Sequence, residues 1–356
     1  MLLPAAGRPL RLLLGLVLLC IVAVGVQFGS SREAAAAAVT SVLAPVPARV
    51  AIVFLTDSPA SETLSFASDV VTQSRGVDQR FFPRGFQLDV FLLADNSTWQ
   101  PSDASVVPVV PVASGTWSRA AIGLLQYDVQ TIVLANFTGL NSAVHAMRRK
   151  QAEREGTTWV RGPTVGAWEK AMYAALRDPV LGGYSFVWFA EQDVFIPSVE
   201  ALHRLTALAL QSDEDYVSAP ISAYQPHLSW GYWYDFDHAN YPRPWYRGQA
   251  SFVGLSRTFL NVLDGHRDRH GKFFFLEAFL PTVAVVVNTT RILLPLEMAT
   301  VGWTSHDVVT LEDIVRYPHN IYHPIRKLST HTDLREALKS NPAPVWKQVQ
   351  TASPVA

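Results

Sequence analysis

The stretch Tyr184-Ser185-Phe186-Val187-Trp188-Phe189-Ala190-Glu191-Gln192-Asp193-Val194-Phe195-Ile196-Pro197 joins a long apolar run to two closely spaced acids. An apolar run rich in aromatic and β-branched residues is typical of a central strand covered on both faces. Burying Glu191 and Asp193 without partners would be costly, so we expect both at the carboxyl end of this strand, where open α/β sheets bind ligands. Their i, i+2 spacing places both side chains on one face of an extended chain.

The segments around this stretch predict an α/β fold, a mostly parallel, Rossmann-type sheet covered by helices. Short apolar runs with β-branched residues predict strands at 50–55, 88–93, 131–134, 216–219, 250–256 and 291–298. The polar segment 61–74 and the basic, polar segment 143–155 are helix candidates. Apolar residues at helical spacing predict a helix at 165–177 and another that Ser198 can cap.

Composition narrows the class of protein. The chain has 356 residues, is 49% hydrophobic and 17% charged, and carries a net charge of −1. A large core is therefore expected, and a nucleic-acid binder that depends on counterion release is not. The single cysteine, Cys20, excludes an intramolecular disulfide and cysteine-based zinc sites.

The amino end has the pattern of a membrane anchor. Arg8 and Arg11 precede Leu12–Phe28, a run without charges that would span about 26 Å as a helix. The excess of positive charge before the run predicts a cytosolic amino end and a luminal remainder. We expect a cytosolic tail at 1–11, a transmembrane signal-anchor at 12–28, a stem at 29–48, a catalytic domain at 49–330 and a tail at 331–356. A cleaved signal peptide is the alternative, because small residues at 34–38 offer cleavage sites.

Three Asn-x-Ser/Thr sequons, at Asn96, Asn136 and Asn288, lie on the side predicted to be luminal, in keeping with a glycoprotein.

The acid pair suits a hard divalent cation. Mg²⁺ and Mn²⁺ prefer oxygen ligands, usually one or two carboxylates completed by water and substrate phosphates. A cation held by Glu191 and Asp193 could clamp a diphosphate and neutralise its charge as it leaves. A strand end that is simply capped or paired with a cation is the alternative for these acids.

The stretch Val187–Ile196 resembles the strand and metal motif of GT-A-type glycosyltransferases, usually written Asp-x-Asp, and here the triplet is Glu-Gln-Asp. A short tail, one anchor, a stem and a luminal domain is also the layout of Golgi type II membrane glycosyltransferases. The resemblance implies a GT-A-like catalytic domain and a nucleotide-sugar donor. It further implies Mn²⁺ or Mg²⁺ and a glycan or glycoprotein acceptor, in the Golgi or ER membrane.

The resemblance also implies roles for individual residues. Asp95 corresponds to the position that contacts the nucleotide, together with Glu191 and Asp193. Glu277 corresponds to the acidic general base, which would activate the acceptor hydroxyl for displacement with inversion, although a retaining enzyme on the same fold stays open. His323 resembles a carboxyl-terminal histidine that completes the metal shell. From the residues alone, Glu277 could equally be a paired acid at a helix start, and His323 a loop histidine.

Two further features leave alternatives open. The aromatic residues between Tyr224 and Tyr246 could stack on an acceptor sugar or fill a gap over the sheet. The runner-up functions are a metal-dependent hydrolase or phosphotransferase on a doubly wound sheet, and a non-catalytic glycan-binding membrane glycoprotein. The chain has no Gly-x-Ser-x-Gly elbow and no P-loop, which removes the serine-hydrolase and P-loop versions.

Overall fold

The computed structural model describes residues 48–56, 60–73, 85–95, 109–111, 122–127, 131–132, 135, 137, 154, 156, 167–225, 230, 233–302 and 309–340. All of them belong to one compact unit, residues 48–356. The segment 12–28, predicted to be a membrane anchor, lies outside the described residues. Among the helices that are described, none is both long and apolar enough to cross a bilayer.

The fold is built on an eight-stranded sheet with the order β10-β6-β9-β5-β1-β2-β4-β3. Every strand runs in the same direction except β9, which is antiparallel to β5 and β6. The strands are β1 (Ala48–Leu55), β2 (Phe86–Asp95), β3 (Val109–Pro111), β4 (Ile122–Tyr127), β5 (Phe186–Glu191), β6 (Tyr216–Val217), β9 (Phe252–Ser256) and β10 (Ile292–Leu293). The expected mostly parallel α/β sheet is confirmed.

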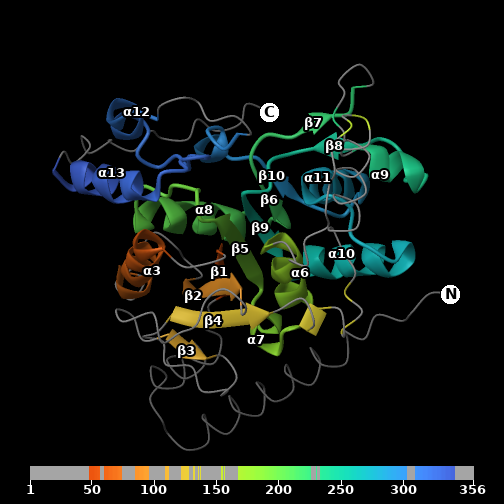
Figure 1. Ribbon diagram of the computed structural model, residues 1–356, viewed down its shortest axis with the longest axis horizontal. Helices are drawn as coiled ribbons and strands as arrows, with labels where there is room; N and C mark the ends of the chain where they lie inside the picture. The colour runs from red at the N-terminus through yellow and green to blue at the C-terminus, as the bar shows by residue number, and fades with distance from the viewer. Residues whose placement is uncertain are drawn as a thin grey trace, which may run out of the picture. The chain divides into compact units, whose positions relative to one another are not determined.

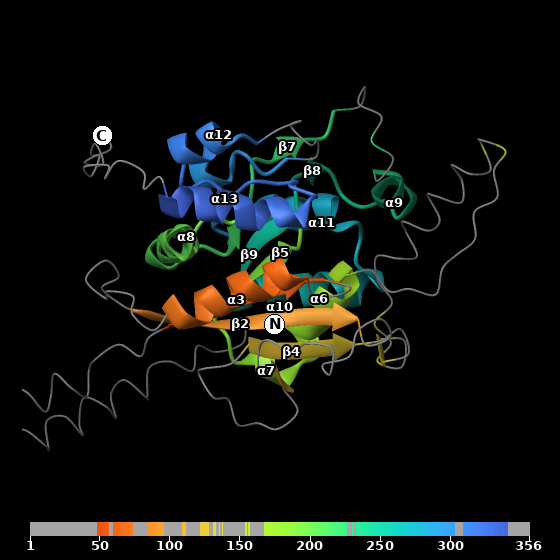
Figure 2. The ribbon, with the colours of Figure 1, turned by 60° about the vertical axis from the view of Figure 1, so that its left-hand side comes forward.

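Helices cover both faces of this sheet, and the two faces have separate cores (Figures 1 and 2). One face carries α3 (Ser61–Gln73) and α8 (Val199–Gln211), which pack on residues such as Ile52 and Trp188. The other face carries α6 (Ala167–Arg177), α10 (Arg257–His270) and α11 (Leu276–Val286), which pack on residues such as Val53 and Phe189. Because alternate residues of a strand point to opposite faces, β1 and β5 supply apolar residues to both cores, which accounts for their unbroken apolar runs.

Smaller elements complete the unit. They are α7 (Pro179–Gly182), a hairpin of β7 (Ser222–Ala223) with β8 (Tyr246–Arg247), α9 (Trp233–His238), a 3₁₀ helix η4 (Leu296–Met298), α12 (Leu311–Arg316) and α13 (Leu328–Ser340). Helix α13 continues past residue 330, the domain end expected from the sequence, and Leu334 is buried in a small third core.

Two strand predictions were wrong. Residues 131–132 form a helical turn, in which the Ala135 and Phe137 amides donate to Thr131 and Ile132. The strand that pairs with β2 is β4, at Ile122–Tyr127. Of the strand expected over 291–298, only Ile292–Leu293 pairs, and η4 follows.

Candidate metal and donor site

Three of the predicted site residues meet at the carboxyl edge of the sheet. One ligand atom from each of Glu191, Asp193 and His323 lies within 4.8 Å of those of the other two. His323 Nε2 is 3.4 Å from Asp193 Oδ1 and 3.9 Å from Glu191 Oε2. Two carboxylates and an imidazole that converge in this way form a ligand set for a divalent cation.

The two acids converge across a turn. Strand β5 ends at Glu191, and the Val194 amide donates back to the Glu191 carbonyl at 3.1 Å, so Gln192 and Asp193 lie in the turn. The i, i+2 spacing predicted both acids on one face of an extended chain, and this geometry was wrong beyond Glu191. Gln192 points to the neighbouring strand end, where its Oε1 accepts from the hydroxyl of buried Thr56 at 3.0 Å. Gln192, the middle residue of the Glu-Gln-Asp triplet, is thus hydrogen-bonded at the end of β1.

His323 reaches the acids because its segment is fixed beside the β5 turn. Phe195 and Tyr322 exchange two backbone hydrogen bonds of 2.8 and 3.0 Å, and the Ile325 amide donates to the Asp193 carbonyl at 2.8 Å. The side chains of Phe195, Tyr322 and Ile325 share the third core with α12 and α13. Segments about 130 residues apart in the sequence are thereby held in register at the site.

The carbonyl of Gly302 fixes the tautomer of His323. It lies 2.8 Å from His323 Nδ1 and also accepts from Gln249 Nε2 at 2.8 Å. The Gln249 amide is itself oriented, because its Oε1 accepts from the Ala250 amide at 2.9 Å. A carbonyl can only accept, so we assign the proton to Nδ1, which leaves the Nε2 lone pair facing the carboxylates. Metal-binding histidines have this arrangement, in which the second ring nitrogen donates to a fixed acceptor.

The electrostatics of the three groups favour a positive charge between them. The His323 side chain is only 7% exposed, whereas Glu191 and Asp193 are 33% and 28% exposed. Burial raises the pKa of Asp193, but the hydrogen bond and charge of His323 outweigh it, and the pKa falls below its usual value. Burial lowers the pKa of His323, but Asp193 outweighs it, and that pKa is raised. A proton on His323 or a metal ion can each supply the missing positive charge.

Trp168 was not anticipated as part of this site. It lies in the first turn of α6 and its indole Nε1 donates to Glu191 Oε1 at 2.6 Å, while its ring packs on Phe189. Apolar residues at helical spacing predicted the helix that carries Trp168, but spacing does not reveal that its N–H reaches a carboxylate. Gln249 was missed for the same reason.

Glu277 and Asp95 lie outside the three-residue cluster. Glu277 is half-buried in the first turn of α11, and its carbonyl accepts from the Gly248 amide, next to Gln249, at 2.8 Å. Burial raises the pKa of the neighbouring Tyr216 hydroxyl, and the charge of Glu277 raises it further. Asp95 is the last residue of β2, two residues beyond Leu93. In the sheet, Leu55 of β1 pairs with Leu93 of β2 on one side and with Glu191 of β5 on the other. The backbone of Asp95 is therefore at the same edge of the sheet as the cluster.

The aromatic segment is largely a packed core. Trp233, Phe236, Tyr241 and Trp245 are each at most 6% exposed. Of this segment, Tyr224 and Trp230 are only partly buried, at the border of that core. The interpretation as gap-filling therefore applies to the four buried rings.

Of the three predicted sequons, one lies among the described residues. The sequon at Asn288 lies on an exposed turn after α11. The sequons at Asn96 and Asn136, and the helix expected at 143–155 apart from residue 154, lie outside the described residues.

No protein-family profile and no curated protein sequence matches this chain. Among solved structures, mouse xyloside xylosyltransferase 1 in its apo form is 12% identical, with a TM-score of 0.34, covering 80% of this chain and 99% of that one. The bifunctional glycosyltransferase WbbM is 15% identical, with a TM-score of 0.36, covering 83% of this chain and 45% of that one. A mannosyltransferase from Pyrobaculum calidifontis, in complex with GDP-Man and Mn²⁺, is 12% identical, with a TM-score of 0.30, covering 84% and 66%. All three are glycosyltransferases.

Proposed function

We propose that this protein is a metal-dependent glycosyltransferase that moves a sugar from a nucleotide-sugar donor to an acceptor glycan or glycoprotein. The observation that carries the proposal is the cluster of Glu191, Asp193 and His323, in which Gly302 binds the Nδ1 of His323 and the Nε2 faces the two carboxylates. A cation on two carboxylates and one neutral imidazole retains positions for the diphosphate oxygens of a donor.

The residues of the chain divide the work of the reaction. Glu191, Asp193 and His323 would hold Mn²⁺ or Mg²⁺, which supplies charge neutralisation to the departing nucleoside diphosphate. Asp95 would contact the nucleotide from the end of β2. Glu277 would accept the proton of the acceptor hydroxyl. At the same time the acceptor oxygen would bond to the anomeric carbon of the donor sugar, and the bond from that carbon to the diphosphate would break, with inversion.

The cellular setting follows from the amino-terminal sequence. We infer a single-pass type II protein of the Golgi or ER membrane, anchored by residues 12–28, with the catalytic unit in the lumen. The exposed sequon at Asn288 supports exposure of this unit to the glycosylation machinery. A shift of mobility on enzymatic deglycosylation, reduced by Asn288→Gln and abolished when Asn96, Asn136 and Asn288 are all replaced by Gln, would test the location.

The decisive experiment combines a donor screen with one substitution. Purified protein is mixed with UDP- and GDP-sugars with and without Mn²⁺, and both the unfolding temperature and sugar transfer are measured. Asp193→Asn keeps the shape of the side chain but removes its charge, and we expect it to reduce transfer by at least about 100-fold. Asp268→Asn, an exposed acid on α10, is the matched control and should leave transfer within about twofold of wild type.

Each alternative has its own signature in this experiment. Full activity of Asp193→Asn would contradict the role of the acid pair. Stabilisation by nucleotide-sugar without metal would preserve the donor site and remove the metal. Release of phosphate or sugar without any acceptor would indicate the hydrolase, and binding of glycans without donor turnover would indicate the non-catalytic glycoprotein.

A further inference from the structure

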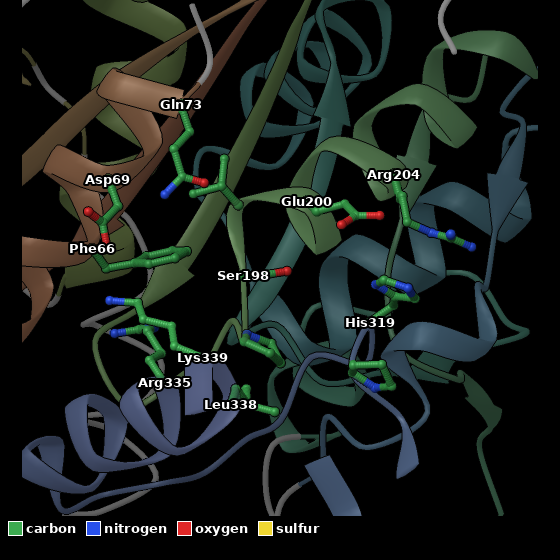
Figure 3. A pocket seen from close by; sticks show the side chains of 13 residues that line it. Phe66, Asp69, Gln73, Ser198, Glu200, Arg204, His319, Arg335, Leu338 and Lys339 are labelled. Carbon is green, nitrogen blue, oxygen red and sulfur yellow. The ribbon is translucent and has the colours of Figure 1, made fainter. Parts of the chain in front are cut away.

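A cavity of about 540 Å³ lies between α3, α8, α13 and the turn at Pro318–His319, apart from the three side chains of the proposed metal site. Glu191, Asp193 and His323 do not line it. Its volume is in the range that holds small organic ligands, about 300–1,000 Å³. Figure 3 shows Phe66, Arg335, Leu338 and Lys339 gathered at one end of this cavity, with Glu200, Arg204 and His319 at the other.

Arg335 is held so that one edge of its guanidinium remains available. Its Nε donates to the Ile196 carbonyl at 3.2 Å, and its Cζ lies 4.1 Å from the ring centre of Phe66 and 5.1 Å from that of Phe195. Within the part of the chain that the structure describes, neither terminal amino group has a hydrogen-bond partner or a carboxylate within 4.0 Å. A planar guanidinium fixed by Nε and stacked on aromatic rings presents these two groups as a fork for an oxyanion.

The charge of Arg335 is poorly compensated. Burial lowers the pKa of Arg335 to about 10, and among the described residues the charge of Asp69 opposes this shift. Asp69 lines the same cavity but forms no ion pair with Arg335 within 4.0 Å. Lys339, one turn further along α13, is already paired with Glu336 at 2.9 Å. A partly desolvated cation without a close counter-charge is costly in the empty cavity, and an anionic ligand would offset that cost.

The far end of the cavity is lined by polar side chains. His319 Nδ1 is buried and has no hydrogen-bond partner among the described residues. Glu200 and Arg204 share that end and balance each other in charge. The cavity thus offers an oxyanion fork at one end and apolar walls from Pro197 and Leu338.

We propose that this cavity is a second ligand site, which binds a small organic anion through a carboxylate or phosphate group on the terminal amino groups of Arg335. The body of the ligand would lie against Phe66, Pro197 and Leu338. Because Phe195 and Ile196 contact Arg335 and follow Asp193 closely in the sequence, the ligand would tie α13 to the segment that carries the metal cluster.

The test uses the purified full-length chain in buffer freed of metal by a chelating resin, so that the metal cluster does not take part. The probes are phenyl phosphate and benzoate, which share a flat apolar body, and neutral benzamide as the control. Binding is measured by calorimetry. We expect one or both anions to bind with dissociation constants below 10 mM and benzamide not to bind.

The variant Arg335→Met keeps an unbranched apolar stem between the two rings and should weaken anion binding at least about tenfold. The control Lys327→Ala removes an exposed cation that does not line the cavity, and should bind as wild type does. Asp193→Asn should also bind as wild type does, which separates this site from the metal cluster. Tighter binding of phenyl phosphate identifies a phosphate ligand, and tighter binding of benzoate a carboxylate.

A second measurement needs no variant. Phenylglyoxal modifies accessible arginines, and mass spectrometry should show that the anionic probe protects Arg335 but not Arg243, an exposed arginine outside the cavity. The proposal is overturned if no anion binds below 10 mM, if benzamide binds equally well, or if Arg335 is modified at the same rate with and without the probe.

Discussion

Replacing Trp168 with Phe tests whether the indole sets the geometry of the metal cluster. The change removes the N–H that donates to Glu191 Oε1 at 2.6 Å and keeps an aromatic ring for packing on Phe189. A hydrogen bond to a charged group contributes about 1.5–3 kcal/mol, and 1.4 kcal/mol corresponds to a tenfold change in affinity. Since the Glu191 side chain is 33% exposed, water replaces part of the lost bond, and we expect the lower end, about tenfold weaker Mn²⁺ binding.

Calorimetric titration of the metal-free protein with Mn²⁺ measures this effect directly. The matched control is Trp245→Phe, which also removes an indole N–H, here one that donates to the Tyr241 carbonyl at 3.0 Å in the aromatic core. Both variants should lose some thermal stability, but only Trp168→Phe should lose metal affinity. Equal Mn²⁺ affinities in the two variants, within about twofold, would refute the role assigned to Trp168.

Three further predictions concern pH, catalysis and packing. In the metal-free protein, burial lowers the pKa of His323, but the contact with Asp193 outweighs this effect, and the pKa is raised. The protonated imidazole therefore stabilises the fold below pH 6.5, and this stabilisation is lost as the pH rises through the raised pKa. The difference in unfolding temperature between wild type and His323→Gln should accordingly shrink toward high pH. Glu277→Gln should lower the turnover number about 10²- to 10⁴-fold while calorimetry shows unchanged Mn²⁺ affinity, because the base lies outside the cluster, and a loss of metal affinity would contradict this. Gly254→Ala should lower the free energy of unfolding, measured with denaturant, by about 1–3 kcal/mol, because the new Cβ would lie 2.6 Å from a ring carbon of buried Phe186. Gly265→Ala, on an open helix face, should raise the free energy of unfolding by about 0.5–1 kcal/mol.

The central part of the sheet could be predicted because burial on both faces leaves a direct mark on the sequence. Strands β1 and β5 feed both cores, so nearly every residue in them is apolar, and few environments in a folded chain select such a short, unbroken apolar run. Still shorter apolar runs are compatible with either a buried strand or a buried helical segment. Thr131–Leu134 has the composition of a strand, yet residues 131–132 are helical. Ile132 and Phe137 are buried, and Phe137 packs edge-on against Tyr173.

The candidate metal ligands were easier to predict from the sequence than the groups that hydrogen-bond to them. An acid pair at a strand end can be read from the sequence, and the resemblance to GT-A-type enzymes pointed to His323. The supports depend on tertiary geometry: Trp168 comes from α6, Gln249 from the loop before β9, and Gly302 contributes only a carbonyl. A backbone acceptor has no signature in the identity of its residue.

The glutamine in the acidic triplet is compatible with a metal site for a structural reason. Because the chain turns after Glu191, the middle side chain is directed to the end of β1, where a buried hydroxyl from Thr56 requires an acceptor. A carboxylate at this place would bring a third negative charge next to Glu191 and Asp193, whereas an amide oxygen accepts the same hydrogen bond without charge. In the proposed metal site, with His323 as the third ligand, the two carboxylates would balance one divalent cation, and a neutral residue at position 192 would preserve that balance.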